Sequence, residues 1–77
     1  MSTKKLKKEM ILEKIEQVTK KNIEQELLIG YYQSIIAKSD DKKTISETQM
    51  KIEQMKAAVE FNDGYLEYVA HLLADLD

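Results

Sequence analysis

The chain has 77 residues, no cysteine and a formal net charge of −2. Its length allows one domain that buries a small share of its surface, the absence of thiols excludes disulfides and thiolate metal sites, and the net charge gives no general attraction to nucleic acid. With 43% hydrophobic and 34% charged residues, the composition is too apolar for a disordered chain and ordinary for a helical one.

The first predicted element is a long helix over residues 3–38. Ser2 or Thr3 can cap its N-terminus, and the sequence contains no proline that would break it. Its apolar residues recur at helical spacing: Ile11, Ile15, Val18, Ile29, Tyr32 and Ile36. The polar residues 39–43 that follow indicate a connecting loop, which extends over 39–45 up to the second helix.

The second predicted helix spans residues 46–76. Thr44 begins one capping box and Ser46 begins a second, overlapping one. We favour Ser46 as the cap, because Ile45 and Met50 would then form a hydrophobic staple.

The second helix carries a heptad repeat, which is typical of a coiled-coil seam. Its seam positions are Ile52, Met55, Val59, Asn62, Leu66, Val69, Leu73 and Leu76. An antiparallel alignment of the two helices pairs Ile15 with Val69 and places Asn22 opposite Asn62. Two facing Asn side chains satisfy each other and fix the register of the seam.

The tripeptide Asn62-Asp63-Gly64 is a strong turn signal and competes with this interpretation. We favour one continuous helix, because the heptad passes through the tripeptide without a change of phase and Gly64 falls on the outer face. The alternative is a three-helix arrangement with a break at residues 62–64.

The chain has more apolar surface than a two-helix contact can bury. Each large apolar side chain contributes about 1.5–3 kcal/mol when buried, so this surface should be covered. We expect an all-α, coiled-coil-like helical hairpin that forms a homodimeric four-helix bundle. A third helix that folds back, or a different protein, are the other candidates. The predicted interface residues are Leu27, Leu28, Tyr31, Ile35, Phe61, Tyr65, Tyr68 and Leu72.

The sequence lacks the residue patterns of common catalytic sites. Its serines have no histidine near them in the predicted hairpin, and no glycine-rich phosphate loop is present. His71, the single histidine, follows Glu67 by four residues and faces Glu13 in the antiparallel register. Because His71 and Glu67 both point away from the seam, we interpret His71 as a surface residue and predict no metal, no cofactor and no enzymatic activity.

Four lysines near the N-terminus form the most concentrated basic patch: Lys4, Lys5, Lys7 and Lys8. We favour cross-helix ion pairs with Asp75 and Asp77, which lie at the same end of the hairpin. The functional alternative is contact with a polyanion. In that case a hairpin dimer would bind RNA or DNA through its first helix, using Lys4, Lys5, Lys7, Lys8, Lys14, Lys20 and Lys21.

From these features we expect a small non-catalytic protein–protein interaction module. It would act as an adaptor, an inhibitor or an assembly factor, as small bacterial and phage helical proteins do. No stretch is long and apolar enough for a membrane span, and Glu9 and Glu13 interrupt any signal-peptide core. The expected location is therefore the cytoplasm, with no membrane partner.

Overall fold

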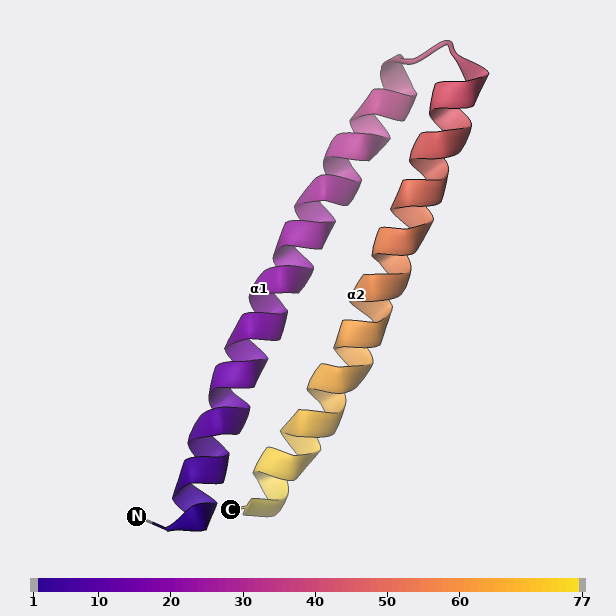
Figure 1. The fold of residues 1–77 in the computed structure, drawn as a ribbon. Coiled ribbons are helices and arrows are strands. Elements are labelled where there is room, and N and C mark those ends of the chain that lie inside the picture. The colour runs from indigo at the N-terminus through magenta and orange to yellow at the C-terminus, as the bar shows by residue number, and fades with distance from the viewer. Residues whose placement is uncertain (1, 77) are drawn as a thin grey trace.

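The computed structural model describes residues 2–76 and contains two helices, α1 (Thr3–Lys38) and α2 (Lys42–Leu76). The helices run antiparallel along their whole length, joined by a short loop at one end, and the start of α1 and the end of α2 lie side by side at the other (Figure 1). No strand occurs among the described residues. The predicted all-α helical hairpin is therefore confirmed.

Helix α1 has the predicted bounds. The Ser2 side chain accepts a hydrogen bond from the backbone N–H of Lys5 at 3.1 Å and so caps the helix. The helix ends where Ser39 takes an extended conformation, with φ −98° and ψ 138°. The Ser39 N–H donates to the carbonyl of Ile36 at 3.3 Å and closes the last turn.

Helix α2 begins four residues earlier than predicted, because Asp41 caps it instead of Ser46. The Asp41 carboxylate accepts from the backbone N–H of Lys43 at 3.1 Å and from the Thr44 hydroxyl at 2.7 Å. The Asp41 N–H in turn donates to the Ser39 hydroxyl at 3.2 Å. The loop is therefore residues 39–41, and the predicted loop 39–45 with its Ser46 cap is wrong.

Helix α2 is continuous through Asn62, Asp63 and Gly64. No residue among those described has a positive φ, and a Cβ built on Gly64 meets no atom within 4 Å. The turn tripeptide is overridden because both helices bury a seam on either side of it, which stabilises the helical conformation. The favoured continuous helix is confirmed, and the alternative three-helix arrangement is wrong.

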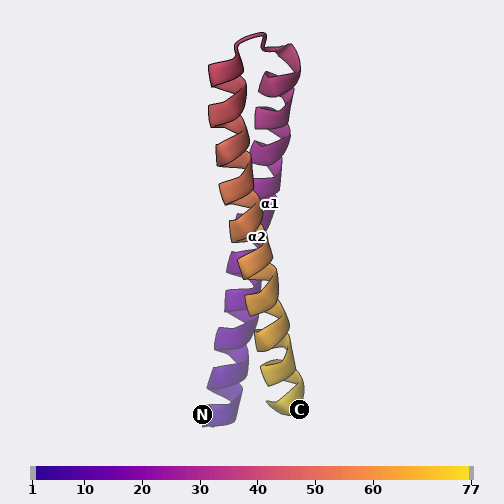
Figure 2. The ribbon, with the colours of Figure 1, turned by 90° about the vertical axis from the view of Figure 1, so that its right-hand side faces the viewer.

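The core is a single seam between the two helices, at the predicted heptad positions. Ile11, Val18, Ile52 and Val69 are its most buried apolar side chains. The other seam residues are half-buried: Ile15, Ile29, Tyr32, Ile36, Met55, Val59, Leu66, Leu73 and Leu76. The helices cross at a shallow angle (Figure 2), as heptad packing requires.

A polar layer in the middle of the seam confirms the predicted register. Asn62 Nδ2 donates to Asn22 Oδ1 at 2.9 Å. Asn22 Nδ2 donates to Asp63 Oδ1, also at 2.9 Å. No buried side-chain nitrogen or oxygen in the described chain lacks a hydrogen-bond partner. The pair of Asn residues is thus satisfied in an otherwise apolar seam, as the sequence indicated.

The molecule is a thin rod of 60 × 15 × 12 Å. Its radius of gyration is 17.6 Å, whereas a compact domain of this length has about 11.5 Å. Its accessible surface is 6084 Å², against about 4,900 Å² for a compact protein of this mass. No described side chain is completely buried. A two-helix rod leaves most of each helix uncovered, and this exposed area is where a site must lie.

Candidate interaction surface

One side of the hairpin carries a second apolar stripe, beside the seam. On α2 its members recur at intervals of three and four residues: Ala58, Phe61, Tyr65, Tyr68 and Leu72. Phe61 is 76% exposed and Tyr68 is 60% exposed, while Tyr65 and Leu72 are half-buried at the edge of the seam. This stripe has the spacing of a second heptad seam with no helix of the described chain packed on it.

Helix α1 contributes to the same side through residues that repeat at heptad intervals. Met10 and Lys14 contact the same hollow as Tyr65, Tyr68 and Leu72. Leu28 and Ile35 repeat the helical position of Lys14, and Tyr31 repeats that of Met10. We call the surface formed by these α1 residues and the α2 stripe the tyrosine face.

Seven of the eight predicted interface residues lie on the tyrosine face, and Leu27 does not. Leu27 is 70% exposed and occupies the heptad position opposite the seam, on the outside of α1. The near-continuous apolar run in α1 made Leu27 and Leu28 look equivalent in the sequence. The pairing with α2 separates them, because only Leu28 lies beside the partner helix.

One hollow on the tyrosine face is a groove between the helices, near the start of α1 and the end of α2. Its floor is formed by Ile11 and Val69, which are 8% and 4% exposed. Apolar walls and two basic rim residues complete it. The groove residues are Lys7, Met10, Ile11, Lys14, Tyr65, Tyr68, Val69 and Leu72. We call this the terminal groove.

A second hollow, near the loop, has a different character. Ile36, Met50 and Ile52 supply its apolar contacts. The remaining lining residues are polar or charged: Gln33, Ser46, Gln49, Glu53, Gln54 and Lys56. Because polar groups dominate its rim, it is less suited to burying a large apolar partner than the terminal groove.

The charges of the hairpin are divided between its two sides. Five exposed glutamates occupy equivalent heptad positions on the side away from the tyrosine face: Glu9, Glu16, Glu53, Glu60 and Glu67. On the tyrosine face, four of the positions next to the seam carry lysines: Lys7, Lys14, Lys21 and Lys51. The outer positions of the same face carry Lys38 and three acids, Glu24, Glu47 and Asp75, so lysines outnumber acids on this face. The tyrosine face is therefore locally basic although the chain is acidic overall.

Aromatic side chains continue the tyrosine face toward the loop. The rings of Tyr31 and Tyr32 are tilted at 52° with centroids 5.7 Å apart. Lys51 Nζ lies 5.7 Å from the centroid of the Tyr32 ring, within the range of a cation–π contact. Tyr32 faces the seam, so this contact joins α2 to α1 and leaves Tyr31 exposed.

The N-terminal lysines do not form one surface. Lys4, Lys5 and Lys7 are exposed, whereas Lys8 is half-buried at the end of the seam. Within the described chain no ion pair joins Lys4, Lys5 or Lys7 to Asp75. Asp77, the other acid predicted there, lies outside the described residues.

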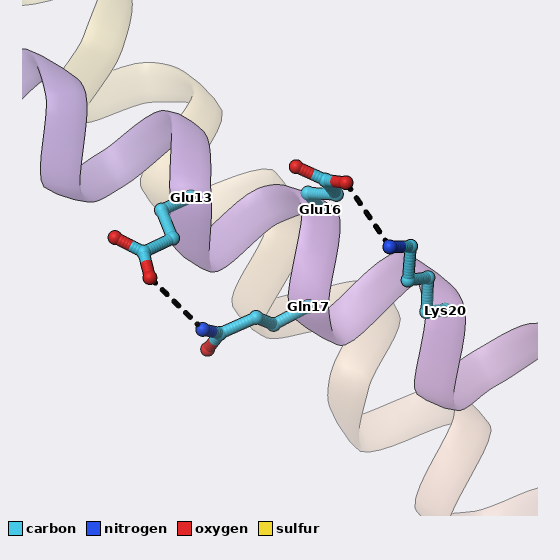
Figure 3. A network of polar contacts seen from close by, with 4 residues as sticks. All are labelled: Glu13, Glu16, Gln17 and Lys20. Atoms are coloured by element: carbon cyan, nitrogen blue, oxygen red, sulfur yellow. Dashed lines mark hydrogen bonds and ion pairs between the residues drawn. The ribbon is translucent and has the colours of Figure 1, made fainter.

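Further polar contacts of α1 run along the helix and do not reach α2 (Figure 3). Lys20 Nζ lies 3.1 Å from Glu16, and Gln17 Nε2 donates to Glu13 at 3.3 Å. Both contacts join residues four positions apart, which stabilises a helix by a few tenths of a kcal/mol. Lys20 is thus turned to the outside of α1, away from the tyrosine face.

His71 is exposed. Glu13, which the antiparallel register placed opposite His71, is hydrogen-bonded within α1 to Gln17. Within residues 2–76, no three His, Cys, Asp or Glu side chains are grouped so that they could hold a metal ion. In the same part of the chain, neither helix combines the length and apolar character that crossing a membrane requires.

Two features of the hairpin were missed from the sequence. Thr48 is 8% exposed and occupies the seam position before Ile52; extending the heptad by one step would have found it, but its polar side chain hid the pattern. Lys7 and Lys14 were assigned to a basic patch and a basic helix, whereas the fold places both on the rim of the terminal groove. Their seven-residue spacing, with Met10 between them, was the available signal.

Comparison with protein-family models, with curated proteins and with solved structures finds no match to this chain.

Proposed function

We propose that this protein is a small non-catalytic interaction module that works by binding another protein, as an adaptor, an inhibitor or an assembly factor. The observation that carries the proposal is the tyrosine face, a second heptad stripe with exposed aromatic side chains. Phe61, Tyr31 and Tyr68 are all at least 60% exposed. Aromatic residues of this kind are enriched at protein interfaces, where they provide a large contact area with few rotatable bonds.

The energetic argument favours a covered face. Burying a large apolar side chain contributes about 1.5–3 kcal/mol, and several such residues together offset the cost of association. A second copy of the chain is the simplest cover, because two hairpins packed face to face make a four-helix bundle. The proposal thus includes a homodimer as one form of the bound state, beside a complex with a different protein.

Binding of RNA or DNA through α1 is the weaker candidate. Of the seven lysines assigned to it, Lys7, Lys14 and Lys21 repeat at heptad intervals and form one row along the helix. Lys20 is turned outward beside Glu16, and acidic residues interrupt the remaining surface. A row of three lysines makes few phosphate contacts, so we expect no binding to a duplex oligonucleotide at physiological salt in a gel-shift titration.

The test of the proposal is the solution mass of the chain over a dilution series, for the wild type and for Phe61→Asp. If the tyrosine face is the contact surface, Phe61→Asp weakens association at least about tenfold, because the loss of one buried aromatic exceeds 1.4 kcal/mol. If the chain associates with itself, the measurement follows the dissociation of that oligomer. If the chain is a monomer, the measurement follows the dissociation of its complex with a partner protein that the chain has captured.

The controls are Ala57→Asp, which adds the same charge on the outside of α2, and Glu60→Lys on the acidic side. Both positions are exposed, so neither variant should change association by more than about twofold. Equal weakening by Phe61→Asp and Ala57→Asp would show that the tyrosine face is not the contact surface.

A further inference from the structure

We infer that the terminal groove binds an acidic amphipathic helix, which lies along it as the third helix of a local three-helix bundle. This inference rests on the proposed function and names the kind of partner. Four features support it: the spacing of the groove residues, the burial of its apolar floor, the charge of its rim and the charge of the opposite side of the hairpin.

The spacing indicates that the occupant is a helix. Tyr65, Tyr68 and Leu72 follow one another at intervals of three and four residues, which is the spacing that a helix presents to a neighbouring helix. On α1 the groove residues Lys7 and Lys14 are one heptad apart. A hollow bounded on both sides by helical rows accepts a straight, rod-like partner that runs parallel to them.

The walls of the groove provide apolar area for such a helix. Met10 is 61% and Tyr68 is 60% exposed, above a floor of Ile11 and Val69 that is already closed to water. A partner side chain of the size of Leu or Ile can therefore contact the walls without the hairpin opening. The tyrosine rings also carry hydroxyl groups, which suit the partly wet edge of an interface.

The rim selects the charge of the partner. Lys7 and Lys14 are both exposed and make no ion pair within residues 2–76. No acidic residue occurs among the described residues that line the groove. A partner helix with Glu or Asp beside its apolar stripe would pair with both ammonium groups, while their alkyl chains cover its edge. A helix with Lys at those positions would be repelled.

The same charges disfavour a second copy as the occupant. If two grooves packed on each other about a two-fold axis, both copies of Lys7 and Lys14 would line the contact, with no carboxylate from either groove. The acidic side of a second copy, with Glu53, Glu60 and Glu67, has the right charge. It lacks a comparable apolar stripe, however, and head-to-tail stacking of this kind would give a ring or an open filament of many copies rather than a dimer.

The experiment uses two synthetic amphipathic peptides of about 20 residues, the length of a helix that spans 30 Å. Both have the same Leu and Ile stripe; one has Glu and the other has Lys at the flanking positions. Fluorescence anisotropy measures the affinity of each for the full chain. We expect the Glu-flanked peptide to bind at least about tenfold more tightly, with a difference that shrinks as salt is added.

Charge reversal locates the site. In the double variant Lys7→Glu with Lys14→Glu, the preference should invert in favour of the Lys-flanked peptide. The matched control Lys20→Glu with Lys56→Glu changes the same net charge at exposed positions outside the groove, and it should retain the wild-type preference. Chemical shifts in NMR spectra should change at Met10, Tyr65, Tyr68 and Leu72 on addition of the Glu-flanked peptide.

Three results would overturn the inference. One is equal affinity for the two peptides, and another is inversion of the preference by the control variant as well. The third is a stable dimer that binds neither peptide and dissociates on Phe61→Asp, which shows that a second copy covers the groove. That last result leaves the proposed function standing. A chain that binds neither peptide and does not respond to Phe61→Asp in any complex would contradict both.

Discussion

Asn22 is 7% exposed, and its side-chain amide takes part in two hydrogen bonds, accepting one from Asn62 and donating one to Asp63. In a seam of otherwise apolar side chains, a one-heptad slip would leave each of these amides without a partner. An unpaired buried polar group costs about 1–3 kcal/mol. This layer therefore fixes how far one helix is shifted along the other.

A double-mutant cycle at this layer tests that role. Asn22→Ala should lower the free energy of unfolding by about 1–3 kcal/mol, because Asn62 loses its acceptor. Asn62→Ala should cost less once Asn22 is already alanine, with a coupling energy of about 0.5–1.5 kcal/mol. Urea denaturation followed by circular dichroism measures both. A coupling energy near zero would mean that the two amides do not depend on each other.

Asp41 is the residue whose titration should affect α2. Its hydrogen bond from the Thr44 hydroxyl, and then that from the Lys43 N–H, hold the pKa of its carboxyl below the ordinary value of 3.8. A lowered pKa in the folded state means that the ionised carboxylate stabilises the fold. This stabilisation is present above the pKa of the unfolded chain and is lost as the pH falls through the folded value.

We therefore expect Asp41→Ala to lower the melting temperature at pH 7, and we expect the difference from the wild type to shrink below about pH 4. Ser46→Ala, at the cap predicted from the sequence, is the matched control and should leave the melting temperature nearly unchanged at either pH. Thermal melts of both variants, followed by circular dichroism at both pH values, decide whether Asp41 or Ser46 caps α2. If Ser46→Ala lowered the melting temperature as much as Asp41→Ala, the longer loop 39–45 predicted from the sequence would be favoured instead.

At the scale of the element, α2 persists through a sequence that favours a turn. Asn62 and Asp63 are held by the polar layer, and Gly64 is exposed with open space around its Cα. The seam residues Val59 and Leu66 lie on either side of the tripeptide. Their burial stabilises the helix by more free energy than the turn preference of the tripeptide costs. Local preference is thus overridden by tertiary packing.

Gly64→Ala should raise the free energy of unfolding by about 0.5–1 kcal/mol, since alanine loses less backbone entropy than glycine in a helix. Gly30→Ala, in the middle of α1 and equally open, provides the comparison and should have a similar effect. Equilibrium urea denaturation is the measurement. Destabilisation by Gly64→Ala alone would indicate that residues 62–64 are not helical.

At the scale of the molecule, the rod exposes about 1,200 Å² more surface than a compact chain of its mass would. That excess is the basis of both functional proposals, because it includes the tyrosine face. The division of charge gives the rod two unlike sides, one apolar and basic and the other acidic. Substitutions of exposed residues on the tyrosine face should therefore change partner binding but leave the stability of the hairpin nearly unchanged. The Phe61→Asp and lysine-reversal experiments depend on this separation.

The sequence by itself determined the two helices, the bounds of α1 and the register. These follow from the period of apolar residues and from one polar position on each helix, Asn22 and Asn62, which are local patterns with a single good alignment. The start of α2 was not determined, because Asp41, Thr44 and Ser46 are all competent caps. The choice among them depends on how short a loop the packed helices allow.

Only the tertiary structure decided which residues share a surface. The antiparallel pairing brings Lys7 and Lys14 of α1 beside Tyr68 and Leu72 of α2, although the two pairs are far apart in the chain. The same pairing leaves Leu27 on the outside of α1. A heptad shows which residues face the seam, but it does not show which residues of the other helix lie beside them until direction and register are set. The predicted register already implied this pairing, but the hollow between the side chains and its basic rim follow from side-chain packing, which only the folded hairpin shows.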